Sequence, residues 1–290
     1  MVATGKKSII LYTNAESDAG FEITGRVADM LKKGGRQPIL CPRYDEGAAA
    51  AAGPAGFEVS ELESELPSAE MIITFGGDGT ILRAARAAAG PGVPVLGINM
   101  GGIGFMAELE TDDIELISAA AAGKYTLEKR MMLDVEVLRG GKQVCSDFAL
   151  NDVVVKGDNK VIDMNLYGDG QKITGFSGDG AVVATPTGST AYSMAAGGPI
   201  VEPLAHNIIV TPICAHILEA KSFVLVSDRR VTVEIGYKKH NPAYMSVDGC
   251  QHVSIQMGDA INVYKSEKYT HLVRLSNRSF YKKVSEKLGE

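Results

Sequence analysis

The alternation of apolar and polar residues divides the chain into two regions of different character. In the first hundred residues, short apolar runs alternate with segments of helical period. The predicted strands span residues 8–13, 38–41, 71–74 and 93–98, and the predicted helices span 17–33 and 80–89. In the first helix, Ile23, Val27 and Leu31 share one face, and Gly34-Gly35 ends the period. Strands that alternate with helices predict a Rossmann-like α/β domain with a parallel sheet.

From about residue 124 onward, the apolar runs become short and typical of β-strands. Residues 133–138 alternate between apolar and polar side chains, and the Gly140-Gly141 pair that follows predicts a hairpin turn. Further apolar runs span residues 153–155, 164–167, 181–184, 223–226, 231–235, 253–255 and 261–263. Helical periods are scarce here, so we predict a mainly-β second domain. At the tail, residues 280–288 predict a short helix.

Length and the change of pattern together set the expected domains. A chain of 290 residues has room for two domains, and we place the α/β domain at 1–110 and the mainly-β domain at 111–274. The Ala/Gly-rich stretch at 47–56 is expected to form a surface loop with a helical piece. No apolar run approaches the ~18 residues of a membrane span, and the N-terminus has no signal-peptide pattern, so we expect no membrane association.

Composition narrows the classes of function. The formal net charge of −6 argues against nucleic-acid binding, which normally shows a basic surface. A polyanionic substrate stays compatible, because loop amides, local cations or a metal can supply positive potential. The four cysteines have no CxxC spacing and the five histidines form no ligand pattern beside them, so we expect neither a zinc site nor disulfides. A reducing cytoplasm is the simpler location.

The segment at 75–80, Phe-Gly-Gly-Asp-Gly-Thr, lies directly between a predicted strand and a predicted helix. Its glycines permit positive φ and close approach to a ligand, and the helix start offers unpaired amides suited to phosphate. Asp78 could accept a proton from an attacking hydroxyl or help to hold a metal. The alternative is a glycine turn with an aspartate N-cap, and the loop by itself does not decide between the two interpretations.

Two familiar phosphate-binding motifs are absent from the sequence. Neither GxxxxGK[ST] nor a GxGxxG that opens a helix occurs, which disfavours a P-loop NTPase and a Rossmann dehydrogenase.

Three further segments contain groups suited to a nucleotide. The glycine-rich loop at 99–105 follows a parallel-type strand, beyond whose carboxyl end ligands bind in open α/β sheets. Phe105 could stack on a base there, or be an ordinary core residue. Residues 178–199 combine hydroxyls and glycines with few charges, which suits ribose and phosphate oxygens or a turn-rich loop of a β protein. Asn151-Asp152, at a strand start, could bind a ribose diol or cap a turn.

Together these segments resemble the NAD kinase family. The matching motifs occur in the family's order and approximate spacing, at residues 76–80, 99–105, 151–152, 178–199 and 247–249. The block Thr-Pro-Thr-Gly-Ser-Thr-Ala-Tyr, with the later Gly-Gly-Pro, is highly specific to NAD kinases. The Gly-Gly-Asp-Gly-Thr loop has relatives in diacylglycerol-type kinases and phosphofructokinases.

The resemblance implies both a fold and an activity. It implies an N-terminal α/β domain, a β-sandwich-like C-terminal domain, a tail at 275–290 that returns to the first, and a site between domains completed by a neighbouring subunit of a homodimer or homotetramer. It implies a transferase that moves the terminal phosphoryl group of ATP, another NTP or polyphosphate onto the adenosine 2′-hydroxyl of NAD, giving NADP. Mg²⁺ or Mn²⁺ would bridge the donor phosphates, with no dedicated protein metal site. Phosphoryl transfer needs mainly alignment and charge neutralisation, which suits these residues.

The family's site residues carry over to the matching positions. Asp78 would be the catalytic base. The donor phosphates would be cradled by Gly76, Gly77, Gly79 and Thr80. The NAD-binding residues, some of them across the subunit interface, would be Asn99, Phe105, Asn151, Asp152, Asp179, Thr187, Thr190, Ala191 and Tyr192. Asp248, in the Val247-Asp248-Gly249 match, and Lys221, where the family commonly has arginine, are further candidates.

Two other functions fit single motifs. A lipid kinase of the diacylglycerol type shares the glycine loop, but the hydroxyl block, Asn151-Asp152 and the lack of an apolar or basic membrane-facing stretch argue against it. A catalytically silent NAD-binding sensor would not need Asp78 beside a phosphate loop. The sequence leaves open the preferred donor, acceptance of NADH, oligomer size, feedback by NADP or NADPH, and the roles of Lys221 and Cys250.

Overall fold

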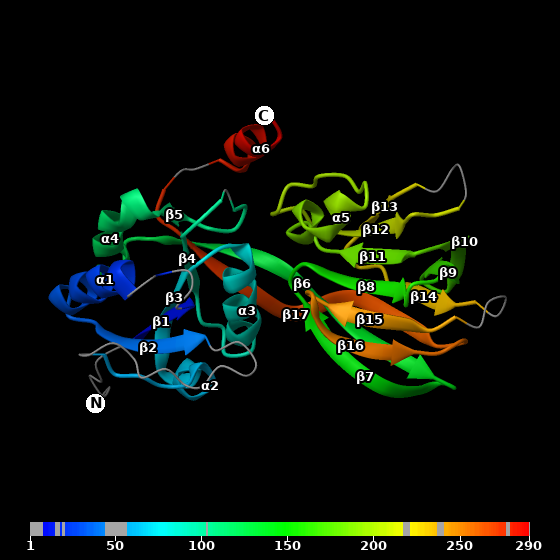
Figure 1. Ribbon diagram of the computed structural model, residues 1–290, viewed down its shortest axis with the longest axis horizontal. Helices are drawn as coiled ribbons and strands as arrows, with labels where there is room; N and C mark the ends of the chain where they lie inside the picture. The colour runs from blue at the N-terminus through cyan, green and yellow to red at the C-terminus, as the bar shows by residue number, and fades with distance from the viewer. Residues whose placement is uncertain are drawn as a thin grey trace. The chain divides into compact units, whose positions relative to one another are not determined.

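Figure 1 shows the computed structural model, which describes residues 8–14, 18, 21–43, 57–102, 104–216, 221–236, 241–276 and 279–289. The chain divides into two compact units. The first comprises Met1–Lys129 and Thr270–Glu290, and the second comprises Arg130–Tyr269.

The first unit is built on a parallel sheet with the strand order β2-β1-β3-β4. Its strands are β1 (Ser8–Asn14), β2 (Gln37–Arg43), β3 (Ala69–Phe75) and β4 (Val95–Asn99). β4 also pairs in parallel with the short β5 (Leu109–Glu110) and, at Val95, with Leu272 of β17 (Ala260–Arg274). The predicted α/β domain with a parallel sheet is therefore confirmed.

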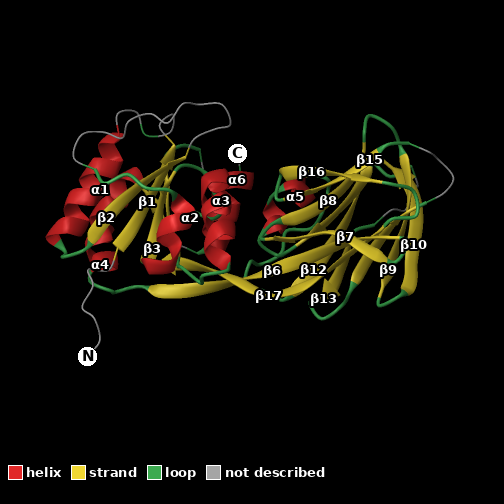
Figure 2. Ribbon diagram, turned by 90° about the horizontal axis from the view of Figure 1, so that it is seen from below, coloured by secondary structure: helices red, strands yellow, loops and turns green. Residues whose placement is uncertain are grey.

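Helices cover both faces of this sheet (Figure 2). One face carries α1 (Glu22–Lys33), the 3₁₀ helix η3 (Thr111–Leu116) and α4 (Ile117–Ala121), and the other carries α2 (Leu62–Glu65), followed by η2 (Leu66–Ser68), and α3 (Asp78–Ala89). Because side chains along a strand point alternately to opposite faces, Leu96 and Ile98 of β4 pack with α1 and α4, whereas Gly97 faces Ile81 of α3.

The helix predicted over 17–33 begins later, at Glu22. The carboxylate of Asp18 accepts hydrogen bonds from Ile23 N at 3.2 Å and Thr24 N at 2.8 Å. Such an acceptor for first-turn amides stands before a helix, not inside it, so the earlier start was wrong. The stretch at 47–56 lies outside the described residues.

The second unit consists of two mainly antiparallel sheets. One has six strands in the order β13-β12-β11-β8-β15-β16, and the other contains β10-β9-β14-β17, with the β6–β7 hairpin joined to β17. The strands of the six-stranded sheet are β8 (Asp152–Gly157), β11 (Gly180–Ala184), β12 (Asn207–Ile213), β13 (Phe223–Val226), β15 (Ala243–Val247) and β16 (Cys250–Ile255). Those of the other are β6 (Thr126–Arg139), β7 (Lys142–Ala149), β9 (Ile162–Gly168), β10 (Gln171–Gly178) and β14 (Val231–Ile235).

Buried side chains from both sheets form one core in the second unit. Val153, Val183 and Met245 of the six-stranded sheet share it with Leu166 and Val233 of the other. Two sheets joined by a common apolar core make a sandwich. The predicted mainly-β, sandwich-like domain is confirmed.

The second face of the six-stranded sheet is apolar as well. Val154, Val182 and Ile209 pack there with Ala196 and Val201. These last two residues follow η4 (Gly188–Thr190) and α5 (Tyr192–Ala195). Burial on this face therefore fixes the hydroxyl-rich block on the sheet.

The division between the units differs from the predicted boundary at 110/111 and falls at 129/130. The reason is that Ile114, Ile117 and Ala120 of η3 and α4 belong to the core around α1. The tail from Thr270 is part of the first unit, and the predicted short helix is present as α6 (Phe280–Leu288). None of the described helices is long and apolar enough to cross a membrane.

Gly97 provides a test of the packing between β4 and α3. A Cβ at this position would lie 2.5 Å from Ile81 Cδ1 and 3.2 Å from Ala107 Cα. We expect Gly97→Ala to lower the free energy of unfolding, measured in urea, by about 1–3 kcal/mol through overpacking. The matched control is Gly90→Ala at the end of α3, where a Cβ meets nothing within 4 Å; equal effects of the two substitutions would contradict this account.

Candidate active site

The glycine loop at 76–79 connects β3 to α3. Gly76 has φ of 155°, and a Cβ on it would lie 2.5 Å from Thr80 Oγ1, so only glycine fits. Gly77 and Gly79 are exposed, and Gly77 is the N-cap of α3 without a side-chain cap. The exposed amides of this loop and the positive end of a 12-residue helix form an arrangement that binds phosphate groups.

Asp78 is the first residue of α3 and joins the two glycine loops of the first unit. Its carboxylate accepts hydrogen bonds from Phe105 N at 2.8 Å and Met106 N at 3.0 Å. Because Gly77 is the N-cap, the alternative of an aspartate N-cap does not apply. The half-buried carboxylate is held in orientation, and its oxygens can each accept more than one hydrogen bond.

Gly104 allows this contact. A Cβ at Gly104 would lie 2.5 Å from Asp78 Oδ1, so a side chain there would displace the carboxylate. Gly104 belongs to the predicted loop but was not among the predicted site residues. Nothing in its sequence context distinguishes it from Gly101 and Gly102, which are exposed.

Asn99 braces the second glycine loop from within. It is 2% exposed, and its side-chain amide donates to Gly101 O and to Glu110 Oε2, both at 2.8 Å. The backbone of Gly76 donates to Ile98 O at 3.1 Å, which places the starts of both loops side by side. Asn99 thus shapes the loop in this structure, and its contact with a dinucleotide stays a prediction.

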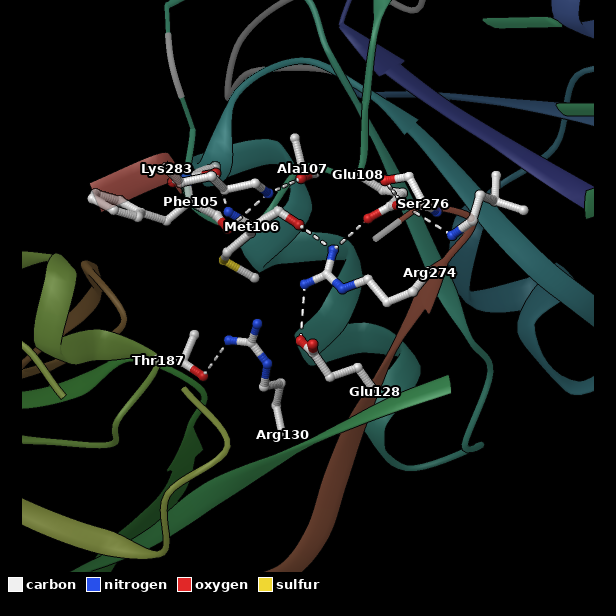
Figure 3. A network of polar contacts seen from close by, with 12 residues as sticks. Phe105, Met106, Ala107, Glu108, Glu128, Arg130, Thr187, Arg274, Ser276 and Lys283 are labelled. Atoms are coloured by element: carbon white, nitrogen blue, oxygen red, sulfur yellow. Dashed lines mark hydrogen bonds and ion pairs between the residues drawn. The ribbon is translucent and has the colours of Figure 1, made fainter. Parts of the chain in front are cut away.

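Phe105 packs against the C-terminal helix. The ring is 8% exposed, its centroid lies 6.4 Å from that of Phe280, and Lys287 Nζ lies 4.2 Å from it. Lys283 Nζ donates to the carbonyls of Phe105 and Ala107 (Figure 3). The adenine contact implied for Phe105 therefore remains a prediction, on a ring that α6 partly covers.

A charged network anchors the same loop to the tail (Figure 3). Glu108 is 2% exposed, and its Oε1 accepts from Leu275 N at 2.9 Å and Ser276 N at 2.7 Å. Arg274 donates to Met106 O at 3.2 Å and pairs with Glu108 and Glu128 at 3.2 and 2.9 Å. The loop that holds Asp78 is thereby tied to the end of β17.

In the second unit, three segments distant in sequence converge at one end of the six-stranded sheet. β8 lies between β11 and β15, with Asp152 opposite Ala184 and Val153 opposite Val247. The residues that follow β11 and β15 are therefore neighbours of the Asn151-Asp152 pair. The sheet register brings together Asn151, Asp152, the block from Thr185 and Asp248.

The hydroxyls of the block mainly order their own loop. Thr185 Oγ1 donates to Leu150 O at 2.5 Å and accepts from Gly188 N at 3.0 Å. Thr190 Oγ1 donates to Thr187 O at 3.2 Å, and Thr187 Oγ1 accepts from the buried Arg130 at 3.1 Å. Thr185, Gly188 and Arg130 were not predicted as site residues, and Arg130 lies in no motif that could have indicated it.

Asn151 has an oxygen that suits a polar ligand. Its side-chain Oδ1 is buried and has no hydrogen-bond partner in the structure. A buried polar atom without a partner is costly in a folded protein. A ligand hydroxyl that donates to this oxygen would remove that cost.

Asp152 and Asp248 form a close carboxylate pair. They are 5% and 6% exposed. Burial, reinforced by the negative charge of Asp248, raises the pKa of Asp152 from 3.8 to about 7. Asp152 therefore changes its charge near neutral pH.

The structure does not bring Asp179 together with this cluster. Asp179 precedes β11 and Thr185 follows it, so about 20 Å of extended chain separates the two residues. Asp179 lines a cavity of about 310 Å³ with Lys156 and Tyr244. The predicted residues Ala191 and Tyr192 open α5, with Tyr192 37% exposed, and Lys221 is exposed before the edge strand β13.

The glycine loop beside a fixed carboxylate, together with a sandwich that carries an ordered hydroxyl loop, defines the class: a two-domain phosphotransferase of nucleotides. The model of the ATP-NAD kinase N-terminal domain matches residues 37–125, and that of the ATP-NAD kinase C-terminal domain matches residues 150–275. The chain belongs to the NAD kinase family.

Relatives and solved structures agree with this assignment. The chain is 40% identical to an NAD kinase of Natranaerobius thermophilus (97% of this chain, 98% of the relative) and 34% identical to one of Ruminiclostridium cellulolyticum (98% of each). An NAD kinase from Archaeoglobus fulgidus in complex with ATP superimposes with a TM-score of 0.71 at 26% identity over 98% of each chain. Yeast NADH kinase complexed with NADH shares the fold, with a TM-score of 0.84 at 21% identity over 99% of this chain and 88% of that one.

The raised pKa of Asp152 predicts a pH-dependent stability. A carboxyl group whose pKa is raised from 3.8 to about 7 on folding stabilises the fold fully below pH 3.8, and this contribution is lost as the pH rises through 7. We expect Asp152→Asn, relative to the native chain, to gain roughly 2 kcal/mol in free energy of unfolding between pH 5 and pH 8. Urea titrations at both pH values measure it, with the exposed Asp158→Asn as control; a pH-independent difference would refute the assigned shift.

Proposed function

We propose that this protein transfers the terminal phosphoryl group of ATP to the adenosine 2′-hydroxyl of NAD and so forms NADP. The observation that carries the proposal is the Asp78 carboxylate, fixed by two backbone amides at the start of α3 beside an exposed glycine loop. Membership of the NAD kinase family and the names of the relatives support the choice of substrates.

In the first unit, Asp78 acts as the general base. The 2′-oxygen attacks the terminal phosphorus, the bond from that phosphorus to the bridging oxygen breaks, and Asp78 takes the hydroxyl proton. Gly76, Gly77, Gly79 and Thr80 form the cradle for the donor phosphates: the exposed Gly77 and Gly79 and the helix dipole face them, and Gly76 and Thr80 shape the loop behind. Phe105 lies against the adenine.

In the second unit, Asn151 and Asp152 bind ribose hydroxyls. The unpartnered Oδ1 of Asn151 and the carboxyl group of Asp152 are acceptors suited to a diol. The dinucleotide pocket is completed by residues of the hydroxyl block and its helix, namely Thr187, Thr190, Ala191 and Tyr192. Asp248 supports binding from its turn beside Asn151, and Asn99 and Lys221 are further candidates for contact with NAD.

A divalent cation, Mg²⁺ or Mn²⁺, accompanies the donor. Among the described residues, no group of three or more His, Cys, Asp or Glu side chains is placed to hold a metal. Mg²⁺ commonly binds mainly through substrate phosphates, and the residues present fit that mode, because the glycine loop leaves the donor phosphates as the principal ligands. When bound, the ion would neutralise charge on the donor phosphates, and the chain itself supplies alignment and the base.

Self-association as a homodimer or homotetramer accounts for the position of Asp179. Asp179 lies at the far end of β11 from Thr185 and therefore outside the Asn151 cluster of its own subunit. It instead contributes to the site of a neighbouring subunit. A cytoplasmic location suits the four free cysteines.

Asp78→Asn tests the base. The substitution keeps the side-chain size but cannot accept the proton, so we expect turnover to fall ~10²–10⁴-fold. Its amide nitrogen cannot accept from Phe105 N or Met106 N, so the melting temperature should fall while the fold and NAD binding are kept. NADP formation is followed with an NADP-specific dehydrogenase in the presence of NAD, ATP and Mg²⁺. The exposed Asp29→Asn on α1 is the control; native turnover in Asp78→Asn would exclude Asp78 as base.

A chain that binds NAD but forms no NADP with any donor, polyphosphate included, would be the silent sensor.

A mixing experiment tests the shared site. Asp78→Asn and Asp179→Asn are each expected to be inactive. The two variants are co-expressed under two affinity tags and purified as mixed oligomers. A mixed dimer should recover about half of the native turnover, because one of its two sites has both Asp78 and Asp179 intact. Mixed oligomers with no more activity than either parent would place Asp179 outside the neighbour's site.

A further inference from the structure

The turn between β15 and β16 is a two-residue loop, Asp248-Gly249. Val247 pairs with Cys250, and both turn residues have positive φ, 50° and 72°. Two left-handed residues define the type I′ hairpin turn, in which Asp-Gly and Asn-Gly are both favoured. The turn itself therefore accepts asparagine as well as aspartate at 248.

The Asp248 side chain does more than close this turn. Its Oδ2 accepts from Leu150 N at 2.8 Å, and its Oδ1 accepts from Asn151 N at 2.7 Å and Asp152 N at 3.0 Å. The Asp248 amide donates to Asp152 O at 2.9 Å. One carboxylate thus binds three consecutive amides where the chain enters β8, and an amide side chain could not accept from all of them.

Gly188 holds the same segment by close approach. A Cβ at Gly188 would lie 2.1 Å from Asn151 O and 2.5 Å from Asn151 C, so the backbones touch and no side chain fits. Thr185 N also donates to Asn151 O at 2.9 Å. The amides of Asn151 and Asp152 are bound by Asp248, and the carbonyl of Asn151 is bound by the Thr185–Gly188 loop.

We propose that Asp248 and Gly188 are positioning residues that clamp the Leu150–Asp152 backbone and thereby aim the Asn151 and Asp152 side chains at the dinucleotide. The inference rests on the proposed function, since it assigns those two side chains to NAD. It changes the role of Asp248 from a ligand contact to a support. The negative charge of Asp248 beside Asp152 gives the clamp a second effect, on the pH range in which Asp152 is ionised.

Asp248→Asn tests the clamp with little change of shape. Losing at least one charge-assisted hydrogen bond should raise the Kd and KM for NAD by about 10–100-fold, while KM for ATP stays within about twofold of native. Binding of NAD is measured calorimetrically on the full chain, and KM by the NADP-coupled assay. Gly188→Ala, which displaces Asn151 from the other side, should weaken NAD binding likewise and decides the question if Asp248→Asn does not fold.

Asp169→Asn is the matched control. Asp169-Gly170 forms the same kind of two-residue turn between β9 and β10, with φ of 49° and 77°, and its carboxylate accepts from Arg230 N and Arg229 in a partly exposed position. The same substitution in the same turn type should leave NAD binding unchanged. An equal loss of NAD affinity in Asp169→Asn would reduce the effect at 248 to general destabilisation and overturn the proposal.

The pH profile separates positioning from mere destabilisation. If ionised Asp152 accepts the ribose hydroxyls, NAD affinity of the native protein falls as the pH drops below about 7. Asp248→Asn removes a like charge, so the pH at which NAD affinity falls should shift to a lower value. Gly188→Ala leaves that charge in place, so the pH at which affinity falls should not change. The proposal is overturned if folded Asp248→Asn binds NAD with native affinity, or if its NAD affinity falls at the same pH as that of the native protein. A native protein that forms no NADP would instead overturn the proposed function.

Discussion

The hydrogen bonds from the amides of Phe105 and Met106 to the Asp78 carboxylate are the contact on which the first unit's site depends. They join a loop that follows β3 to a loop that follows β4, and they set the direction of the Asp78 carboxylate beside the exposed Gly77 and Gly79. Gly104 leaves room for that carboxylate, and Glu108 and Arg274 hold the other side of its loop. Orientation of a single acidic group is thus built from a parallel sheet, two glycine loops and the returning tail.

In the second unit, too, an aspartate carboxylate accepts hydrogen bonds from the backbone amides of another segment. There the carboxylate of Asp248 binds consecutive amides of a different motif, and Gly188 permits the close backbone contact. In both units an aspartate orders the backbone of a second segment through amides that would otherwise need other partners. Glycine is required where the two segments meet because a Cβ would separate them.

Periodicity was sufficient to predict the elements whose burial is simple. The alternation of strands and helices in the first unit and the β-runs of the second predicted the fold class, because those elements bury one clear apolar face. Strands that contain polar residues were not predicted at their full length. β17 extends to Arg274 through Lys265 and Glu267, far beyond the apolar run at 261–263. β12 contains Pro212, which central strands normally exclude; it fits because β13 pairs only with Asn207–Val210.

The candidate site was predictable as motifs but not as geometry. The glycine loop, Asn151-Asp152 and the hydroxyl block each occur as a contiguous signal in the sequence, whereas Gly104, Gly188 and the role of Asp248 depend on contacts between residues 26 to 98 positions apart. The separation of Asp179 from the Asn151 cluster follows from the length of β11 and could not be read from motif spacing.

Transfer of a phosphoryl group to the 2′-hydroxyl of NAD is tested by ³¹P NMR of the product that the purified chain forms from NAD, ATP and Mg²⁺. We expect a new phosphomonoester signal at the 2′ position of the adenosine ribose, formed in step with ADP. A phosphoryl group at any other position, or release of inorganic phosphate with NAD unchanged, would contradict it.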